Sequence, residues 1–286
     1  MRVRELESWR VGELDRRLVT GGAMLALVAG ACLLLPALVP TPHSELSDVV
    51  ARRFAAPCAR TPDGALHVLG TDRFGRDMLF RLALGARVSL IVGLLAALVA
   101  TLAGVLLGAI AGYAGGAWDR AIITFTDAAL AIPRVPLLLL LVALFQPGIA
   151  VTVLAIGLTG WMTVARLVRT EVRALRTRLF VEAAAALGAR PARLIRRHLL
   201  PHAAAPAFVA AALGVGNAIM LEAGLSFLGL GVQPPTASWG NMIAAGRDAL
   251  VVAPWVALEP AALVALVVLA CSLMADGMER ANSRSM

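Results

Sequence analysis

The sequence predicts an all-α integral membrane protein with six transmembrane helices and both termini in the cytoplasm. Hydrophobic residues make up 59% of its 286 residues and charged residues only 15%, whereas soluble domains contain about 25% charged residues. The apolar residues gather in six nearly uncharged runs, each close to the roughly 20 residues that a helix needs to cross a bilayer. Backbone polar groups inside a bilayer must be satisfied within their own segment, so we expect these runs to be helices.

The six runs are separated by segments that contain most of the charged residues. They extend over residues 19–39, 88–111, 122–145, 149–165, 203–225 and 251–275. The first run exceeds the apolar core of a signal peptide and has no convincing small-residue cleavage site after it, so we expect a retained anchor. Buried core helices of a soluble protein are the alternative, but six such runs leave too little chain to cover them.

The arginines predict the orientation of the helices. All 26 basic residues are arginines, and an excess of Lys and Arg marks the cytoplasmic side of a membrane protein. Seventeen of them lie before the first run, at residue 120, between the fourth and fifth runs, or after the sixth, and seven lie on the opposite side. Both termini are therefore expected in the cytoplasm. We assign the net charge of +8 to this topology and not to a nucleic-acid surface.

The composition excludes several classes of function. A chain without lysine cannot form a P-loop or a lysine Schiff base. The four histidines lie outside the apolar runs, and the runs contain neither Gly-x-Ser-x-Gly nor His-Glu-x-x-His, so we expect no catalytic residue of a membrane enzyme. His198 and His202 are four residues apart, but Pro201 between them disrupts the helix that a metal-binding pair requires, so no metal site is expected.

The segment between the fourth and fifth runs predicts a short helix, a break and a second helix. Ala183 to Leu187 are strong helix formers, and Gly188 suits the left-handed position that closes a helix. Pro191 suits the first turn of the next helix, and Pro201 marks the boundary with the fifth run. Arginines flank these elements, so a basic helix on anionic lipid head groups is one interpretation.

The spacing within this segment favours a second interpretation. Glu-Ala-Ala, then Gly six residues after the Glu, then Leu-Pro ending 19 residues after it, resembles the cytoplasmic loop of ATP-binding-cassette (ABC) importer permeases. The resemblance implies that a short helix of this loop inserts into a groove of an ATPase subunit and couples nucleotide-driven closure to the pore. The matching residues are Glu182, Ala183, Ala184, Gly188, Leu200 and Pro201. His198 departs from the family, which often has Ile at this position.

Further matches narrow the resemblance to the C-type subunits of the peptide and nickel importers. They lie in residues 69–77, 85–90, 222–235, 238–240, 253–255 and 276–277. The resemblance implies a type I ABC importer permease fold. In that fold residues 1–85 form an N-terminal arm, the first helix and an external loop. Residues 86–286 form the permease domain, with its coupling loop at about residues 166–202.

The resemblance also implies solutes and partners. The expected solutes are dipeptides or oligopeptides, with nickel, glutathione or another small solute as alternatives. A self-contained channel or ion-coupled transporter is the alternative class of protein. The expected partners are a second, B-type permease subunit, two ATP-binding subunits, an extracytoplasmic solute-binding protein and the bilayer of a bacterial or archaeal inner membrane. ATP and Mg²⁺ are expected on the ATP-binding subunits, and no cofactor on this chain.

Four charged residues lie within or beside the apolar runs, where charges are costly and usually functional. They are Asp127, Arg134, Glu222 and Glu259. Asp127 and Arg134 are two helical turns apart on one face, so we expect their partners elsewhere. Pro133 and Pro136 are expected to kink their helix. We expect Asp127 and Glu222 to face the translocation cavity or a subunit interface; the alternative is that these polar groups hold helices together.

Glycines recur at every fourth position from the second run into the segment that follows it. Gly104, Gly108, Gly112 and Gly116 therefore share one face of a helix. Such a face lets a second helix approach closely. We expect that helix to come from this chain or from a second permease subunit.

Overall fold

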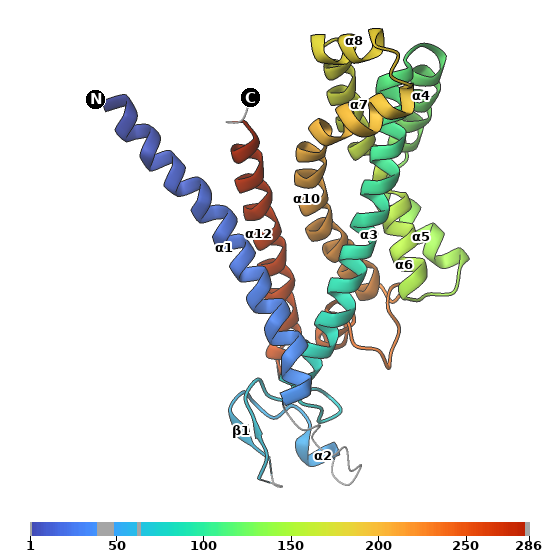
Figure 1. Cartoon of the computed structure of the whole chain (residues 1–286). Coiled ribbons are helices and arrows are strands. Elements are labelled where there is room, and N and C mark those ends of the chain that lie inside the picture. Colours follow the sequence, from blue (N-terminus) through green and yellow to red (C-terminus); the bar gives the residue numbers. More distant parts are fainter. Residues whose placement is uncertain (1, 39–48, 62–63, 284–286) are drawn as a thin grey trace.

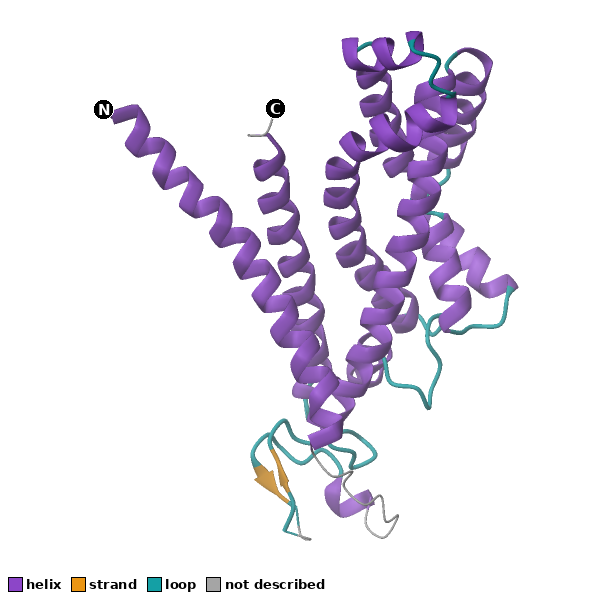
Figure 2. Cartoon of the chain, viewed as in Figure 1, coloured by secondary structure: helices purple, strands orange, loops and turns teal. Residues whose placement is uncertain are grey.

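A computed structural model describes residues 2–38, 49–61 and 64–283, and most of them are helical (Figures 1 and 2). The helices are α1 (Arg2–Leu38), α2 (Val49–Arg52), α3 (Met78–Ala114), α4 (Gly116–Ala131), α5 (Arg134–Leu144), α6 (Ile149–Leu158), α7 (Trp161–Arg176), α8 (Leu179–Ala186), α9 (Pro191–Leu194), α10 (Leu200–Phe227), α11 (Trp239–Gly246) and α12 (Trp255–Ser283). A π-helical turn (Ile195–Leu199) joins α9 to α10, and a 3₁₀ turn (Arg247–Ala249) follows α11. The strands β1 (Ala59–Arg60) and β2 (Leu66–His67) form a small antiparallel hairpin.

Five helical segments of the described chain are long and apolar enough to cross a membrane. They are residues Arg16–Pro36, Met78–Ala114, Ile149–Arg176, Pro191–Phe227 and Trp255–Asn282. A sixth span is possible by length and composition if α4 and α5, which bend by 87°, are counted together. Five of the six predicted runs therefore correspond to continuous candidate spans, and the third corresponds to this broken pair.

The break between α4 and α5 has a local chemical cause. A proline disfavours helical backbone in the residue before it, and Ile132 is extended, with φ −82° and ψ 124°. Pro133 then precedes the first residue of α5, where its missing N–H leaves no gap in a helical hydrogen-bond ladder. The predicted kink is confirmed, but it is a complete break, and it removes Asp127 and Arg134 from a common helix face.

The helices have two distinct ends (Figure 1). The start of α1, the end of α12 and the helix α8 lie at one end, which we call the α8 end. The β hairpin and α2 lie at the other, which we call the hairpin end. The arrangement agrees with the predicted topology, in which both termini and the loop after the fourth run share one side.

Helix α1 lies against α12 through two glycines, Gly21 and Gly277, whose role in packing was not predicted from the sequence. A Cβ at Gly21 would lie 2.7 Å from the Ala270 carbonyl oxygen, and a Cβ at Gly277 would lie 2.8 Å from Leu18 Cβ. Arg17 and Asp276 form an ion pair of 3.5 Å beside this contact. The close approach explains how α1 stays attached to the bundle.

The glycine face of α3 packs against α7 of the same chain. A Cβ added at Gly104 would lie 2.5 Å from Val164 Cβ, and one added at Gly108 would lie 2.5 Å from the Ala165 oxygen. A Cβ added at Gly112 would lie 2.7 Å from the Arg169 oxygen. Gly116 does not continue this face, because α3 ends at Ala114 and Gly115 turns the chain with a φ of +66°. The expectation that Gly116 shares the face was therefore wrong.

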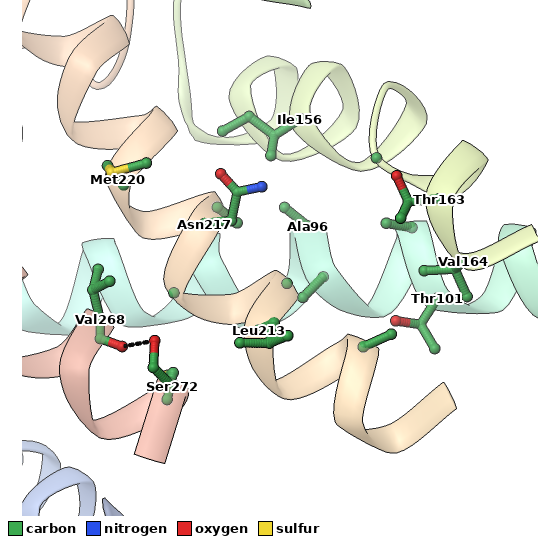
Figure 3. Close-up of a pocket in the computed structure, with 18 of the residues that line it drawn as sticks. Ala96, Thr101, Ile156, Thr163, Val164, Leu213, Asn217, Met220, Val268 and Ser272 are labelled. Atoms are coloured by element: carbon green, nitrogen blue, oxygen red, sulfur yellow. Dashed lines mark hydrogen bonds between the residues drawn. The ribbon is translucent and has the colours of Figure 1, made fainter. Parts of the chain in front are cut away.

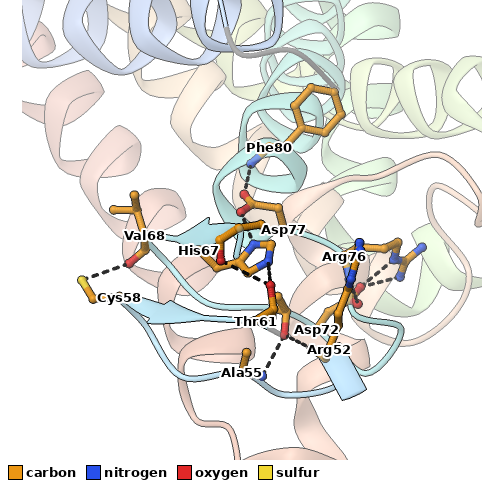
Figure 4. A network of polar contacts seen from close by, with 12 residues as sticks. Arg52, Ala55, Cys58, Thr61, His67, Val68, Asp72, Arg76, Asp77 and Phe80 are labelled. Atoms are coloured by element: carbon orange, nitrogen blue, oxygen red, sulfur yellow. Dashed lines mark hydrogen bonds and ion pairs between the residues drawn. The ribbon is translucent and has the colours of Figure 1, made fainter. Parts of the chain in front are cut away.

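Polar contacts tie the hairpin to the start of α3 (Figure 4). The Asp77 carboxylate caps α3 by accepting a hydrogen bond from the Phe80 N–H at 3.0 Å. The same carboxylate lies 2.7 Å from His67 Nδ1, and His67 Nε2 lies 3.2 Å from Thr61 Oγ1. The segment between the first two spans is therefore anchored to the bundle at a defined point.

Candidate functional site

Helix α8 is held at its end of the molecule by a small number of contacts. Val181 is 3% exposed and belongs to a hydrophobic cluster that includes Val172 of α7 and Leu199 of the π turn. The Phe180 ring lies against the His202 ring of α10, with 5.4 Å between centroids. One face of α8 therefore packs on the bundle, and the rest of the helix is available for contact with another molecule.

The outward face of α8 carries an apolar stripe. Leu179, Ala183, Ala186 and Leu187 follow the spacing of one helix face. All four are exposed, and the side chains of Leu179 and Leu187 are 83% and 90% exposed. Glu182 is also exposed, whereas Ala184 is half-buried on the inner side. We call the four outward residues the α8 stripe.

Gly188 closes α8 in the manner that the sequence predicts. Its φ is +83°, the left-handed region that favours glycine. The Gly188 N–H donates to the Ala185 oxygen at 2.9 Å, and the Ala189 N–H donates to the Ala184 oxygen at 3.1 Å. This pair of bonds is a Schellman motif. Pro191 then begins α9 at a position where it loses no helical hydrogen bond.

Pro201 does not interrupt the chain as strongly as predicted. It lies in the first turn of α10, and residues Pro191–Phe227 form one continuous candidate span. The π turn before it explains the difference, because the Leu200 N–H donates to the Ile195 oxygen five residues earlier. Leu200 is half-buried against the cluster that holds Val181.

Arginines surround the α8 segment. The exposed arginines on the flanks of α8, on α9 and in the π turn are Arg178, Arg190, Arg193, Arg196 and Arg197. None of these five forms an ion pair with an acid in the described part of the chain. The rim of the stripe is therefore electropositive.

A cavity of ≈ 420 Å³ lies among the helices (Figure 3). Its walls come from α3, α6, α7, α10 and α12, with Arg134 contributed by α5. Neither Asp127 nor Glu222 lines this cavity. Arg134 was predicted as a costly charge within a span, but its position at a cavity was not predicted.

Asp127 lies outside the cavity, on α4. Its carboxylate pairs with the Arg166 guanidinium of α7, and both side chains are about half exposed, at 52% and 50%. The expectation that its partner lies on another helix is confirmed. The equivalent pair nearer the α8 end joins Asp119 to Arg169 and is less exposed.

Glu222 lies inside the subunit, where its side chain is fully buried. Ser89 Oγ donates to one carboxylate oxygen at 2.9 Å, and Ser226 Oγ donates to the other at 2.7 Å. Ser89 Oγ also accepts the Trp239 N–H at 3.2 Å. The residue thus connects α3, α10 and α11, which corresponds to the alternative in which a polar group holds helices together.

Known proteins resemble this chain over most of its length. Residues 104–286 match the family described as the inner membrane component of binding-protein-dependent transport systems. A probable peptide ABC transporter permease protein of Sinorhizobium fredii is 46% identical over 209 residues, which cover 73% of this chain and 72% of that protein. The glutathione transport system permease protein of Escherichia coli is 39% identical over 215 residues, which cover 75% of this chain and 71% of that protein.

A solved structure shares the fold. It is the methionine ABC transporter MetNI in an inward-facing conformation, which aligns with a TM-score of 0.56 and 18% sequence identity. The alignment covers 72% of this chain and 97% of the matched chain. More than a quarter of this chain therefore lies outside the part that aligns with the solved structure.

Proposed function

The chain belongs to the family of binding-protein-dependent transport system inner membrane components, and on that premise we propose that it imports peptides and couples to an ATPase subunit through α8. It is a multi-pass, non-catalytic permease subunit of an ABC importer in the inner membrane, with a type I importer permease fold. Permeases of this family work with ATPase and permease partner subunits.

The α8 stripe supports the coupling role. Leu179 begins α8 and Leu187 follows its last residue, and both leucines are more than four-fifths exposed. Apolar side chains exposed in this way are poorly suited to water, and a partner's groove would bury them. Val181 and Phe180 fasten the same helix to α7 and α10, so a force on α8 reaches the bundle. ATP-driven movement of the ATPase subunit would then carry α8, together with Glu182, Ala183, Ala184 and Gly188, and rock the helices around the cavity.

The proposed assembly contains further subunits and ligands. It has a second, B-type permease subunit, two ATP-binding subunits that hold ATP and Mg²⁺, and an extracytoplasmic solute-binding protein. The α8 end faces the cytoplasm in this assembly, and the hairpin end faces the solute-binding protein. The excess of arginine on the side of the termini supports this orientation.

Peptides are the proposed solute because of the relatives. One relative is named a probable peptide permease, and another is named a permease for glutathione, itself a tripeptide. Glutathione is therefore the second candidate solute. Uptake of labelled dipeptides, glutathione and nickel by cells with and without the chain decides among them. Peptide uptake that does not depend on the chain would contradict the proposal.

The coupling role is tested by Leu187→Asp in the complete transporter. Burial of a leucine contributes about 2 kcal/mol, which corresponds to roughly thirtyfold in affinity. We expect much less ATP-binding subunit to co-purify with the tagged variant, and uptake to fall with it.

The matched control is Val251→Asp at the hairpin end. Val251 is 97% exposed, so this substitution adds the same charge to an equally exposed apolar position. We expect it to leave co-purification of the ATP-binding subunit unchanged. Equal loss in both variants, or no loss in Leu187→Asp, would remove α8 as the coupling element.

A further inference from the structure

The charge in the lining of the cavity is positive. Arg134 is the only charged residue among the described residues that line it. Its other polar lining residues are Thr101, Thr163, Asn217 and Ser272. The remaining lining residues are glycine or apolar, and the volume lies in the range of small-molecule sites. An anion in this cavity therefore meets an opposite charge and no acid of its own sign.

Arg134 is held in place by neutral groups. Its Nη2 donates to the Ile156 oxygen at 3.1 Å, and its Nε donates to Thr159 Oγ1 at 3.4 Å. Asp127, seven residues earlier in the sequence, is directed away by the break at Pro133 and pairs with Arg166 instead. In the described chain no carboxylate forms an ion pair with Arg134, so its charge is not neutralised by a partner.

Two lining residues offer unused hydrogen-bonding groups. Asn217 of α10 and Thr163 of α7 are exposed, and neither makes a side-chain hydrogen bond to another described residue. Figure 3 shows Asn217 projecting from α10 towards the helix that carries Ile156. An amide and a hydroxyl of this kind match the amide groups of a peptide backbone.

We propose that this cavity contacts the solute in transit, and that Arg134 attracts the C-terminal carboxylate of a peptide while Asn217 and Thr163 hydrogen bond to its amides. The inference rests on the proposed function. Guanidinium and carboxylate form strong charge-assisted hydrogen bonds, and a low-dielectric wall strengthens their attraction. Arg134 also donates to a carbonyl in the last turn of α6, where a cation interacts favourably with the negative end of the helix dipole. This contact orients the guanidinium, but it supplies no carboxylate to pair with it.

The first test measures the charge of the cavity without any solute. In the complete transporter, Cys32, Cys58 and Cys271 are replaced by Ala, and Thr163→Cys reports on the cavity. The thiol is modified by an anionic and by a cationic methanethiosulfonate of similar size, and the ratio of the anionic rate to the cationic rate is measured. We expect this ratio to fall roughly tenfold in Arg134→Gln, which is the lower end of the effect that charge has on association in a cleft. Arg134→Lys, which keeps the charge but not the planar fork, restores the ratio.

Two further variants keep this test decisive. Asn217→Asp adds a negative charge to the cavity while Arg134 itself is unchanged, and we expect the same fall in the ratio of modification rates. This variant therefore tests the inference even if Arg134→Gln folds poorly. The control is Val251→Cys as reporter at the hairpin end, outside the cavity and away from the proposed ATPase contact, and its ratio stays constant. An unchanged ratio at Thr163→Cys in both Arg134→Gln and Asn217→Asp would overturn the inference.

The second test uses uptake of a dipeptide and its C-terminal amide. With the same solute-binding protein throughout, we expect Arg134→Gln to lower uptake of the free acid several-fold relative to the amide, with Arg134→Lys close to wild type. Equal effects on both peptides would overturn solute contact by Arg134. If wild type imports neither peptide while the thiol ratio still depends on Arg134, the proposed solute is wrong but the anion-attracting cavity stands.

Discussion

The two ends of the molecule differ in how their helices are held in place. At the hairpin end, Glu222 and Trp239 are fully buried and connect three helices through hydrogen bonds to Ser89 and Ser226. At the α8 end, the short helix α8 is fastened by Val181 and Phe180 and exposes an apolar stripe. The hairpin end thus contains a buried polar network, and the α8 end carries a helix with few internal contacts and an apolar stripe suited to a partner.

This difference separates stability from coupling. A buried hydrogen-bond network is costly to break, so the hairpin end is suited to remain fixed while other parts move. A helix with few internal contacts is suited to follow a partner. Substitutions at the hairpin end should therefore lower stability, and substitutions at the α8 end should change communication with the partner.

The largest expected effect is that of Glu222→Ala. It removes the acceptor of two buried serine hydroxyls and leaves a cavity, which we expect to cost about 3 kcal/mol. Thermal unfolding of the purified transporter in detergent measures this loss. The control is Glu259→Ala on α12, because the buried Glu259 Oε2 has no hydrogen-bond partner in the described chain. A Glu222→Ala transporter as stable as the Glu259→Ala one would contradict the stabilising role of the Glu222 network.

A smaller effect on stability is expected from a matched pair of glycines. Gly188 closes α8 and Gly229 follows α10, with φ of +83° and +78°, and a Cβ added at either glycine would have no other atom within 4 Å. Valine at either position costs roughly 1–2 kcal/mol, because L-residues are strained in the left-handed region. We expect only Gly188→Val to uncouple ATP hydrolysis from uptake, because only the Gly188 cap positions α8.

ATP hydrolysis and uptake in the same vesicles measure that uncoupling. Equal, intact coupling in both valine variants would mean that the cap of α8 has no special role. Uncoupling in Gly229→Val alone would reverse the assignment of the two ends.

The smallest effect is expected from Asp127→Asn. The pair of Asp127 with Arg166 is half exposed, and exposed pairs contribute less than about 1 kcal/mol. Asp119→Asn is the comparison, because its pair with Arg169 is less exposed and should matter more. Uptake and co-purification of the second permease subunit decide whether Asp127 acts at a subunit interface. Loss of that subunit in Asp127→Asn alone would establish such a role.

Local chemistry explains what the sequence predicted well. The spans follow from runs of apolar residues, and the break of the third run follows from Pro133 acting on the residue before it. The end of α8 follows from a glycine where only left-handed backbone closes the helix. Each of these features depends on residues close together in the chain, so no knowledge of packing was needed.

Packing between distant segments explains what the sequence missed. Whether a charged residue faces a cavity depends on which helices meet there, so Arg134 was not distinguished from Asp127 and Glu222. The signal available was Pro133, because a break between Asp127 and Arg134 gives the two charges different surroundings. Gly21 and Gly277 had no comparable signal, since their contact joins α1 to α12 across most of the chain.

The π turn before α10 has a consequence for comparing this chain with its relatives. Its hydrogen bond spans five residues, so it is equivalent to a regular helix with one residue inserted. Leu194 and Leu199, five positions apart, are both buried, whereas a regular helix would turn them about 140° from one another. An alignment gap of one residue at Ile195–Leu199 should therefore be read as the gain or loss of this turn. In a relative that lacks this turn, the pattern of inward-facing residues after this point should be shifted by one position relative to the pattern before it.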